Sequence, residues 1–411
     1  MQKLAVMVLI SLTISTSMHA SRIRGYVKSF ALTYSLPEAL SLDENNPPLG
    51  LVANHLRLTF TTRFSQKVSV EAAWDLSPTY SETFSSGIFP TTTGRESGLD
   101  YRITDFERRL IPQPGNSGAG FILNQNLDRL LITVKFKGAD LFIGRQAVAW
   151  GSARFINPTD IVAPFAFNEL DTEDRRGVDA LRLRVPLGVM DELDMGWVMG
   201  NDFKSENSAF FLRGRFYLLR TDVSLIVSAF RNHFMGGVNL ARAIGGAGAW
   251  LEAAWVKPWA FSVQKPGDDA AYFRLSIGLD YSLSGNVYLF SEYHFNSAGR
   301  DDPAAYPETV DSPAFRDGWV YLLGRHYITS GTTIQVTPLL PLSIMAIWNL
   351  SDGSLTLAPS LEYNFAENVY LAAGAYFGIG ADPLEGSMGP VMRSEFGAWP
   401  HVFYTAFRFY F

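Results

Sequence analysis

The chain is dominated by segments in which apolar and polar residues alternate. In "HLRLTFTTRFS" (55–65), the apolar residues from Leu56 to Phe60 are separated by polar ones. The segments "KVSVEAAWDL" (67–76) and "AYFRLSIGLDYSL" (271–283) repeat this pattern. Because successive side chains on a strand point to opposite sides, each segment predicts a β-strand with one apolar and one polar face.

These strands are long. Many run about ten residues, the length that crosses a bilayer at a tilt, whereas strands of soluble proteins average about five or six. We count about eighteen, and the even number is the one that bacterial outer-membrane barrels use. A count of sixteen stays open because 235–244 and 324–337 are weakly patterned. The predicted strands are 26–36, 54–64, 67–76, 127–137, 140–147, 179–187, 192–200, 208–218, 222–231, 235–244, 247–257, 271–283, 286–296, 324–337, 342–350, 354–364, 368–378 and 399–411.

The connections between strands alternate between short and long. Tight turns such as "KGAD" (137–140) and "SLSGN" (282–286) separate long polar or Gly/Pro-rich gaps such as 77–126 and 296–323. Short turns on one side and long loops on the other are typical of outer-membrane barrels. Because hydrocarbon offers no partner to a free backbone amide, such a sheet must close on itself. The sequence therefore predicts an all-β fold, a closed antiparallel transmembrane β-barrel, with 99–110 as a hairpin arm inside a long loop.

The chain ends on "TAFRFYF", in which phenylalanines alternate with other residues up to Phe411. We expect this last strand to pair with the first and to turn its phenylalanines toward lipid and lipopolysaccharide. A terminal aromatic after alternating aromatics resembles the signal that outer-membrane barrels present to their assembly machinery. Tyr281, Tyr288, Tyr363, Tyr370, Trp399 and Tyr410 lie near strand ends and predict aromatic girdles at the two interfaces.

The first twenty residues have the features of a secretory signal peptide. Lys3 gives a positive start, and the mostly apolar stretch 4–14 is too short to span a bilayer. We expect cleavage after Ala20, with an uncleaved anchor as the alternative. The mature chain, 21–411, is then a single barrel domain in the outer membrane of a Gram-negative bacterium.

Composition narrows the function classes. The 411 residues are 47% hydrophobic and 18% charged, and the formal net charge is -6. Cysteine is absent, so disulfides and thiolate metal sites are impossible. The mild acidity and the lack of a basic run argue against nucleic-acid binding. We expect no cofactor.

Strand parity places many charged side chains inside the barrel. A charge facing lipid at midplane would cost about 2–4 kcal/mol, so these residues belong in water. A barrel of this size leaves an aqueous passage unless something fills it. One interpretation is a basic ladder that attracts anionic solutes; the other is that the arginines only neutralise neighbouring carboxylates. The inward cations are Arg57, Arg63, Lys135, Arg182, Arg184, Arg213 and Arg215.

The segment 142–185 carries the densest chemistry. It contains "GRQ" (144–146), then Trp150-Gly151 and "RFI" (154–156), and later Arg176, Val178-Asp179 and Leu181-Arg182-Leu183. This pattern resembles alginate-export-type outer-membrane barrels, and equally uncharacterised porin-like barrels of Gram-negative bacteria. The resemblance implies an eighteen-stranded monomer whose Arg-rich lumen passes an anionic polymer or small solutes.

Residues 144–178 are also the candidate constriction. The hypothesis is a loop folded into the lumen; the alternative is an extracellular loop whose charges pair among themselves. If Leu141 and Ile143 face lipid, Arg145 would too, so we expect a bulge or inverse parity there. The candidate edge residues are Arg145, Arg154, Asp160, Asp174, Arg175 and Arg176.

The function that these patterns favour is passive diffusion of small hydrophilic, anionic solutes through a porin-like channel. One alternative is a surface adhesin or structural barrel that uses loops 77–126 and 379–398; another is an exporter of an anionic polysaccharide. We expect no enzyme, because His294 beside Glu292 has neither a serine elbow nor a metal-spaced partner.

Overall fold

The computed structural model describes residues 19–41, 45, 47–82, 101–105, 108–112, 120–164, 170–262, 270–316, 319–387 and 389–411. Of the predicted signal peptide, residues 1–18 lie outside the described residues, and the last two belong to the first strand. No helix among the described residues is long and apolar enough to cross a membrane.

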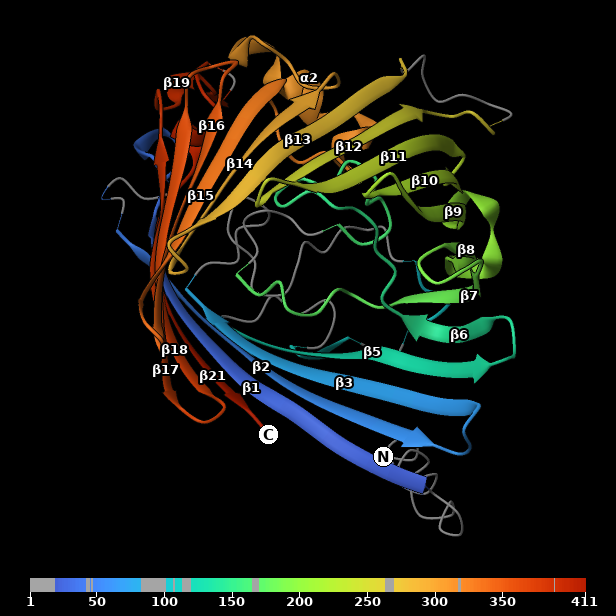
Figure 1. The fold of residues 1–411 in the computed structure, drawn as a ribbon. Helices are drawn as coiled ribbons and strands as arrows, with labels where there is room; N and C mark the ends of the chain where they lie inside the picture. The colour runs from blue at the N-terminus through green and yellow to red at the C-terminus, as the bar shows by residue number, and fades with distance from the viewer. Residues whose placement is uncertain are drawn as a thin grey trace.

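Eighteen antiparallel strands form one closed ring, in which consecutive strands pair and the last strand returns to the first (Figure 1). The prediction of eighteen strands is therefore confirmed and the alternative of sixteen is wrong. The strands of the ring are β1 (His19–Ser35), β2 (Leu49–Arg63), β3 (Val68–Ser81), β5 (Phe121–Lys135), β6 (Asp140–Gln146), β7 (Val178–Pro186), β8 (Glu192–Met199), β9 (Ala209–Leu218), β10 (Thr221–Phe230), β11 (His233–Ile244), β12 (Ala247–Lys257), β13 (Tyr272–Leu283), β14 (Val287–Asn296), β15 (His326–Thr337), β16 (Leu340–Asn349), β17 (Leu355–Ala366), β18 (Val369–Ile379) and β21 (His401–Tyr410).

The ring closes where the two ends of the chain meet. β21 pairs with β1 from Tyr26 opposite Tyr410 to Ser35 opposite His401. Gly25 and Phe411 then exchange backbone hydrogen bonds of 2.8 and 2.9 Å. This pairing removes both sheet edges along that seam, as a barrel surrounded by lipid requires. The expected role of the terminal strand in closing the barrel is confirmed.

The two faces of the barrel differ as the alternation predicts. Phe403, Phe407 and Phe409 are 50%, 40% and 39% exposed and lie on the outer face of β21. Tyr281 and Tyr363 are also exposed, as expected for an interfacial girdle. Two other residues of the predicted girdle point inward instead: the hydroxyl of Tyr288 donates to Asp280, and that of Tyr410 donates to Glu173.

The connections are short at one end of the barrel and long at the other, and part of the long ones lies inside the ring (Figure 1). The gap predicted as 77–126 is shorter, because β3 extends to Ser81 and β5 begins at Phe121. Within it, β4 (Arg109–Ile111) adds to β5, so the described part of 99–110 does not form the predicted hairpin arm. The other short elements are η1 (Glu38–Leu40), η2 (Asn201–Phe203), η3 (Ser205–Asn207), η4 (Pro303–Ala305), α2 (Tyr306–Val310), α3 (Pro313–Arg316), β19 (Leu384–Gly386), β20 (Gly389–Val391) and η5 (Phe396–Ala398).

A charged side chain introduced on the outer face of the barrel should lower the free energy of unfolding far more than one introduced on the inner face. Ile277 is 45% exposed in the middle of β13, so Ile277→Arg should lower the free energy of unfolding in lipid vesicles by about 2–4 kcal/mol. Thr333 lies opposite the inward Tyr288, so Thr333→Arg is a lumen variant for comparison and should cost less than about 1 kcal/mol. Equal costs, measured by denaturant titration, would contradict this assignment of the two faces.

Candidate functional site

The candidate site is the loop between β6 and β7, residues 147–177, which crosses the inside of the barrel. Its first limb, 152–159, hydrogen-bonds to Glu252 on β12, and its second limb, 170–177, reaches Arg57 on β2. β2 and β12 lie nine places apart around the eighteen-strand ring and are therefore opposite each other. The predicted inward loop has these bounds rather than 144–178, because β6 continues to Gln146 and β7 begins at Val178.

Glu252 holds the start and the end of the first limb. Its carboxylate, wholly buried, accepts from the backbone amides of Ser152 (2.8 Å), Ala153 (3.1 Å) and Thr159 (2.8 Å). The Thr159 hydroxyl adds a fourth bond of 2.7 Å. One carboxylate thus satisfies donors that would otherwise be buried without partners, at a cost of about 1–3 kcal/mol each.

Glu292 on β14 does the same for the middle of the limb. It accepts from the amides of Arg154 (2.9 Å) and Ile156 (3.0 Å), and from the indole Nε1 of Trp250 (2.8 Å). On β13, which lies between β12 and β14, Arg274 donates to the carbonyl of Pro158. Three adjacent strands, β12 to β14, therefore fix the backbone of the first limb.

The second limb is fixed to the opposite wall by ion pairs. Lys28 on β1, fully buried, lies 2.8 Å from Asp171 and 2.7 Å from Glu173. Tyr26 donates to Asp174 at 2.9 Å. Although burial raises it, hydrogen bonds and charges from His55 and Lys28 lower the pKa of Asp171 to about 2, so this carboxylate is ionised at neutral pH.

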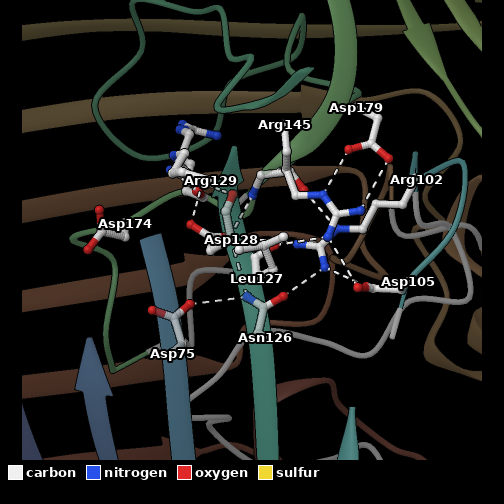
Figure 2. Close-up of polar contacts among 12 residues, drawn as sticks. Asp75, Arg102, Asp105, Asn126, Leu127, Asp128, Arg129, Arg145, Asp174 and Asp179 are labelled. Atoms are coloured by element: carbon white, nitrogen blue, oxygen red, sulfur yellow. Dashed lines mark hydrogen bonds and ion pairs between the residues drawn. The ribbon is translucent and has the colours of Figure 1, made fainter. Parts of the chain in front are cut away.

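A network of arginines and aspartates joins the second limb to β2, β3 and β5. Figure 2 shows the part of this network around Asp75, Asp128 and Arg129. Arg57 contacts Asp75 at 3.0 Å and Asp128 at 2.9 Å, and the other oxygen of Asp128 accepts from the Gly177 amide at 2.8 Å. Arg129 donates to the carbonyl of Arg175 at 2.6 Å. Arg57 is thus inward as predicted, but it is 5% exposed and neutralised.

Arg145 joins the same region through an irregular backbone. Gly144 has a φ of +108°, and a Cβ there would lie 2.2 Å from the Leu130 carbonyl oxygen. This conformation, which favours glycine, accounts for the expected break of parity. Arg145 is 6% exposed and binds Asp179 at 2.8 Å and Asp105 at 3.1 Å (Figure 2).

Asp105 brings part of a second loop into the barrel. Residues 101–105, from the loop between β3 and β5, lie against this network, where Arg102 binds Asp105 at 2.8 Å and Asn126 at 2.7 Å. Burial raises the pKa of Asp105, but hydrogen bonds from Arg102 and Arg108 and the charges of neighbouring arginines lower it to about 2.

Asp160 and Arg175 form an ion pair within the loop itself. Asp160 lies between the two limbs, and Arg175 lies on the second limb. Asp160 is 1% exposed. Burial raises its pKa to about 6, with a further contribution from the Glu252 charge, although Arg175 opposes the rise. This pair agrees with the alternative interpretation, in which charges of the loop neutralise each other. Arg176 follows on the second limb and is half-buried.

The predicted basic ladder is divided by carboxylates. β8 lies between β7 and β9, and its Asp194 binds Arg182 through two bonds of 2.8 and 2.5 Å. Arg184 lies 4.0 Å from the same Asp194. On β9, Arg213 donates to Ser224 at 2.7 Å and Arg215 lies 3.8 Å from Glu192. Arg182 is neutralised, as the second interpretation expects, while the side chains of Arg184 and Arg215 stay 37% and 50% exposed.

The remaining predicted cations have different positions. Arg63 and Lys135 are exposed at the end of the barrel with the short turns. Arg154, on the first limb, reaches Asp280 on β13 at 2.9 Å, and its side chain is 55% exposed. Asp174 also approaches Arg57, at 3.6 Å.

Sequence reasoning missed several residues that hold the loop. Glu252 lies in a strand whose parity was assigned, yet its partners are about a hundred positions away. Asp128 and Arg129 follow each other where β5 shifts register against β3, so simple alternation misplaces one of them. The sequence signal that could have indicated this irregularity is an acidic residue followed directly by a basic one inside an otherwise apolar strand.

His294 and Glu292, the neighbouring pair that the sequence analysis considered for catalysis, are both engaged in contacts inside the barrel. His294 is 3% exposed and its Nδ1 lies 2.9 Å from Ser276, whose hydroxyl donates to the Ile156 carbonyl. The neighbouring Glu292 is occupied by loop amides. Among the described residues, no group of three or more potential ligands could hold a metal ion.

The carboxylate of Glu252 should control the order of the first limb. In Glu252→Gln the side chain has one acceptor oxygen and turns an NH2 group toward amide donors. A loss of about 1.5–3 kcal/mol should speed hydrogen exchange of the 152–159 amides roughly ten- to hundredfold. Glu362→Gln, which removes a partner of Arg408 elsewhere in the lumen, is the control. Unchanged exchange in Glu252→Gln would show that Glu252 does not hold the limb.

No protein-family model and no curated protein sequence matches this chain. Solved structures do match its fold. Acinetobacter baumannii OccAB1 aligns over 95% of this chain and 96% of its own, with a TM-score of 0.59 and 11% identity. Pseudomonas aeruginosa OccD3 (OpdP) aligns over 97% of this chain and 92% of its own, with a TM-score of 0.54 and 8% identity. The structure of P. aeruginosa OpdK with vanillate aligns over 96% of this chain and 100% of its own, with a TM-score of 0.54 and 8% identity. The matches do not support the resemblance to alginate-export-type barrels. The chain has the fold of a Gram-negative outer-membrane porin, a closed eighteen-stranded barrel.

Proposed function

We propose that this protein is a passive outer-membrane channel for small hydrophilic solutes, with a preference for anions. The observation that carries the proposal is the loop 147–177, held across the lumen by charged groups of opposite walls. A loop fixed in this way narrows a water-filled barrel without a moving part. The fold matches to channel structures over nearly the whole chain support the same conclusion.

The preference for anions rests on the inner wall from β5 to β9. Strand register places Lys135, Asp140, Arg184, Asp194 and Arg213 side by side in one row. Together with Arg182, Arg215 and Glu192, these residues make five cations and three carboxylates, while Asp128, Arg129, Arg145 and Asp179 of the same wall add two of each sign. A net positive wall in a narrow lumen raises the local concentration of anions. One of the matched structures contains vanillate, a small carboxylate, which agrees with this class of solute.

The expected surroundings follow from the fold. The protein would lie as a monomer in lipid and lipopolysaccharide, with the short turns in the periplasm. Its terminal strand, ending in Phe411, would be recognised by the barrel-assembly machinery. These partners are expectations that purification from outer membranes and depletion of that machinery would test.

Reversal potentials in a salt gradient test the function. The protein in a planar bilayer should conduct and should prefer chloride over potassium. Arg184→Gln with Arg215→Gln should shift the reversal potential toward that of a cation-selective pore, because these two exposed charges make up the excess on the wall. The permeability ratio should fall about two- to fivefold, a change that corresponds to about 0.5–1 kcal/mol of electrostatic attraction.

Lys204→Gln is the matched control. Lys204 is an exposed lysine in the loop between β8 and β9, outside the ring, and lies 3.9 Å from Asp202. Its removal should leave the reversal potential unchanged. A pore that prefers cations and keeps that preference in the double arginine variant would contradict anion selectivity, and absence of conductance would contradict the channel itself.

A further inference from the structure

We propose that Arg154 is the contact point for a carboxylate solute in this channel, and that Asp280 is a built-in competitor that limits how long the solute stays. The proposal rests on the channel function above. It assigns solute binding to Arg154 and competition with the solute to Asp280, at the place where the first limb meets β13.

Arg154 differs in its exposure from the arginines of the lumen that protein groups enclose, and it shares that exposure with Arg184 and Arg215 of the wall. Arg57, Arg145 and Arg182 are 5–6% exposed, and each binds carboxylates from at least one neighbouring strand. The side chain of Arg154 is 55% exposed. A solute inside the barrel can therefore reach this guanidinium, whereas protein groups enclose the other three.

The guanidinium of Arg154 is also held in place. Its backbone amide is bound by Glu292 at 2.9 Å, and its guanidinium lies over the Trp250 ring, 5.4 Å from the centroid. Trp250 is itself fixed, because it is 5% exposed and its Nε1 donates to Glu292. A cation fixed against an aromatic face loses little conformational freedom when it binds a planar anion.

The ion pair between Arg154 and Asp280 is incomplete. Nε and Nη2 of Arg154 lie 3.1 and 2.9 Å from the same oxygen, Oδ2 of Asp280. That oxygen also accepts from the Tyr288 hydroxyl at 3.0 Å, while Oδ1 accepts from the Gly248 amide at 3.1 Å. The two guanidinium donors thus share one oxygen instead of forming the parallel two-oxygen pair that Arg and a carboxylate prefer.

A free carboxylate could make that parallel pair. When it does, Asp280 keeps the Tyr288 hydroxyl and the Gly248 amide, so it is not left without partners. The exchange therefore costs little in either direction, which is what a channel needs: binding strong enough to draw the solute in and weak enough to release it. Chloride, with no second oxygen, gains less from the same exchange.

Acetate in planar bilayers tests the assignment. In Asp280→Asn the competing charge is removed, and acetate should reduce the chloride current at about two- to fivefold lower concentration than in the unchanged protein. Arg154→Gln should abolish this block, and Arg154→Gln combined with Asp280→Asn should behave like Arg154→Gln alone.

Glu362→Gln is the matched control, because it also removes one lumen carboxylate that pairs with an arginine, Arg408, but it lies on β17, four strands away from Asp280 on β13. If both carboxylate variants change the acetate block equally, the effect is that of net charge and the inference fails while the channel function stands. A protein that does not conduct at all would overturn both. Heat-modifiable mobility on gels verifies that each variant is folded.

Discussion

Every backbone amide in this protein needs an acceptor in places where water is scarce. Along the strands the ring supplies it, and the mutual bonds of Gly25 and Phe411 show that pairing continues to the last residue. Inside the ring, the backbone amides of the loop 147–177 also need acceptors, but no neighbouring strand supplies them. There Glu252 and Glu292 supply the acceptors, and six backbone amides of the first limb bind to these two carboxylates.

This use of carboxylates also determines the charges that a solute meets. Because Glu252 and Glu292 are buried under the loop and Lys28 and Arg57 are paired on the opposite wall, these groups are withdrawn from the passage. The charges that remain exposed are those with incomplete pairs, among them Arg154 on the loop and Arg184 and Arg215 on the wall. In the proposed channel, structural anchoring and solute selectivity are thus assigned to different residues of one lumen.

The alternation of residues was sufficient to predict every strand of the ring and its closure, because lipid on one side and polar groups on the other impose a strict period of two. It failed at the register shift beside Asp128, whereas the break of the period at Gly144 was expected from the position of Arg145. It could not predict that Ser152 would bind Glu252 or that residues 101–105 would enter the lumen, since the residues in contact lie 100 and 76 positions apart in the chain. The inward loop was predicted from its charges, but its fixation by wall carboxylates was not.

The central claim is that the loop 147–177 narrows an open aqueous passage. The chain contains no cysteine, so a single thiol introduced on the second limb reports on that passage directly. Thr172 is exposed between Asp171 and Glu173, and Thr172→Cys should give a stepwise drop in single-channel current when a bulky methanethiosulfonate reagent is added. An unchanged current, with labelling of the thiol verified by mass, would contradict the account.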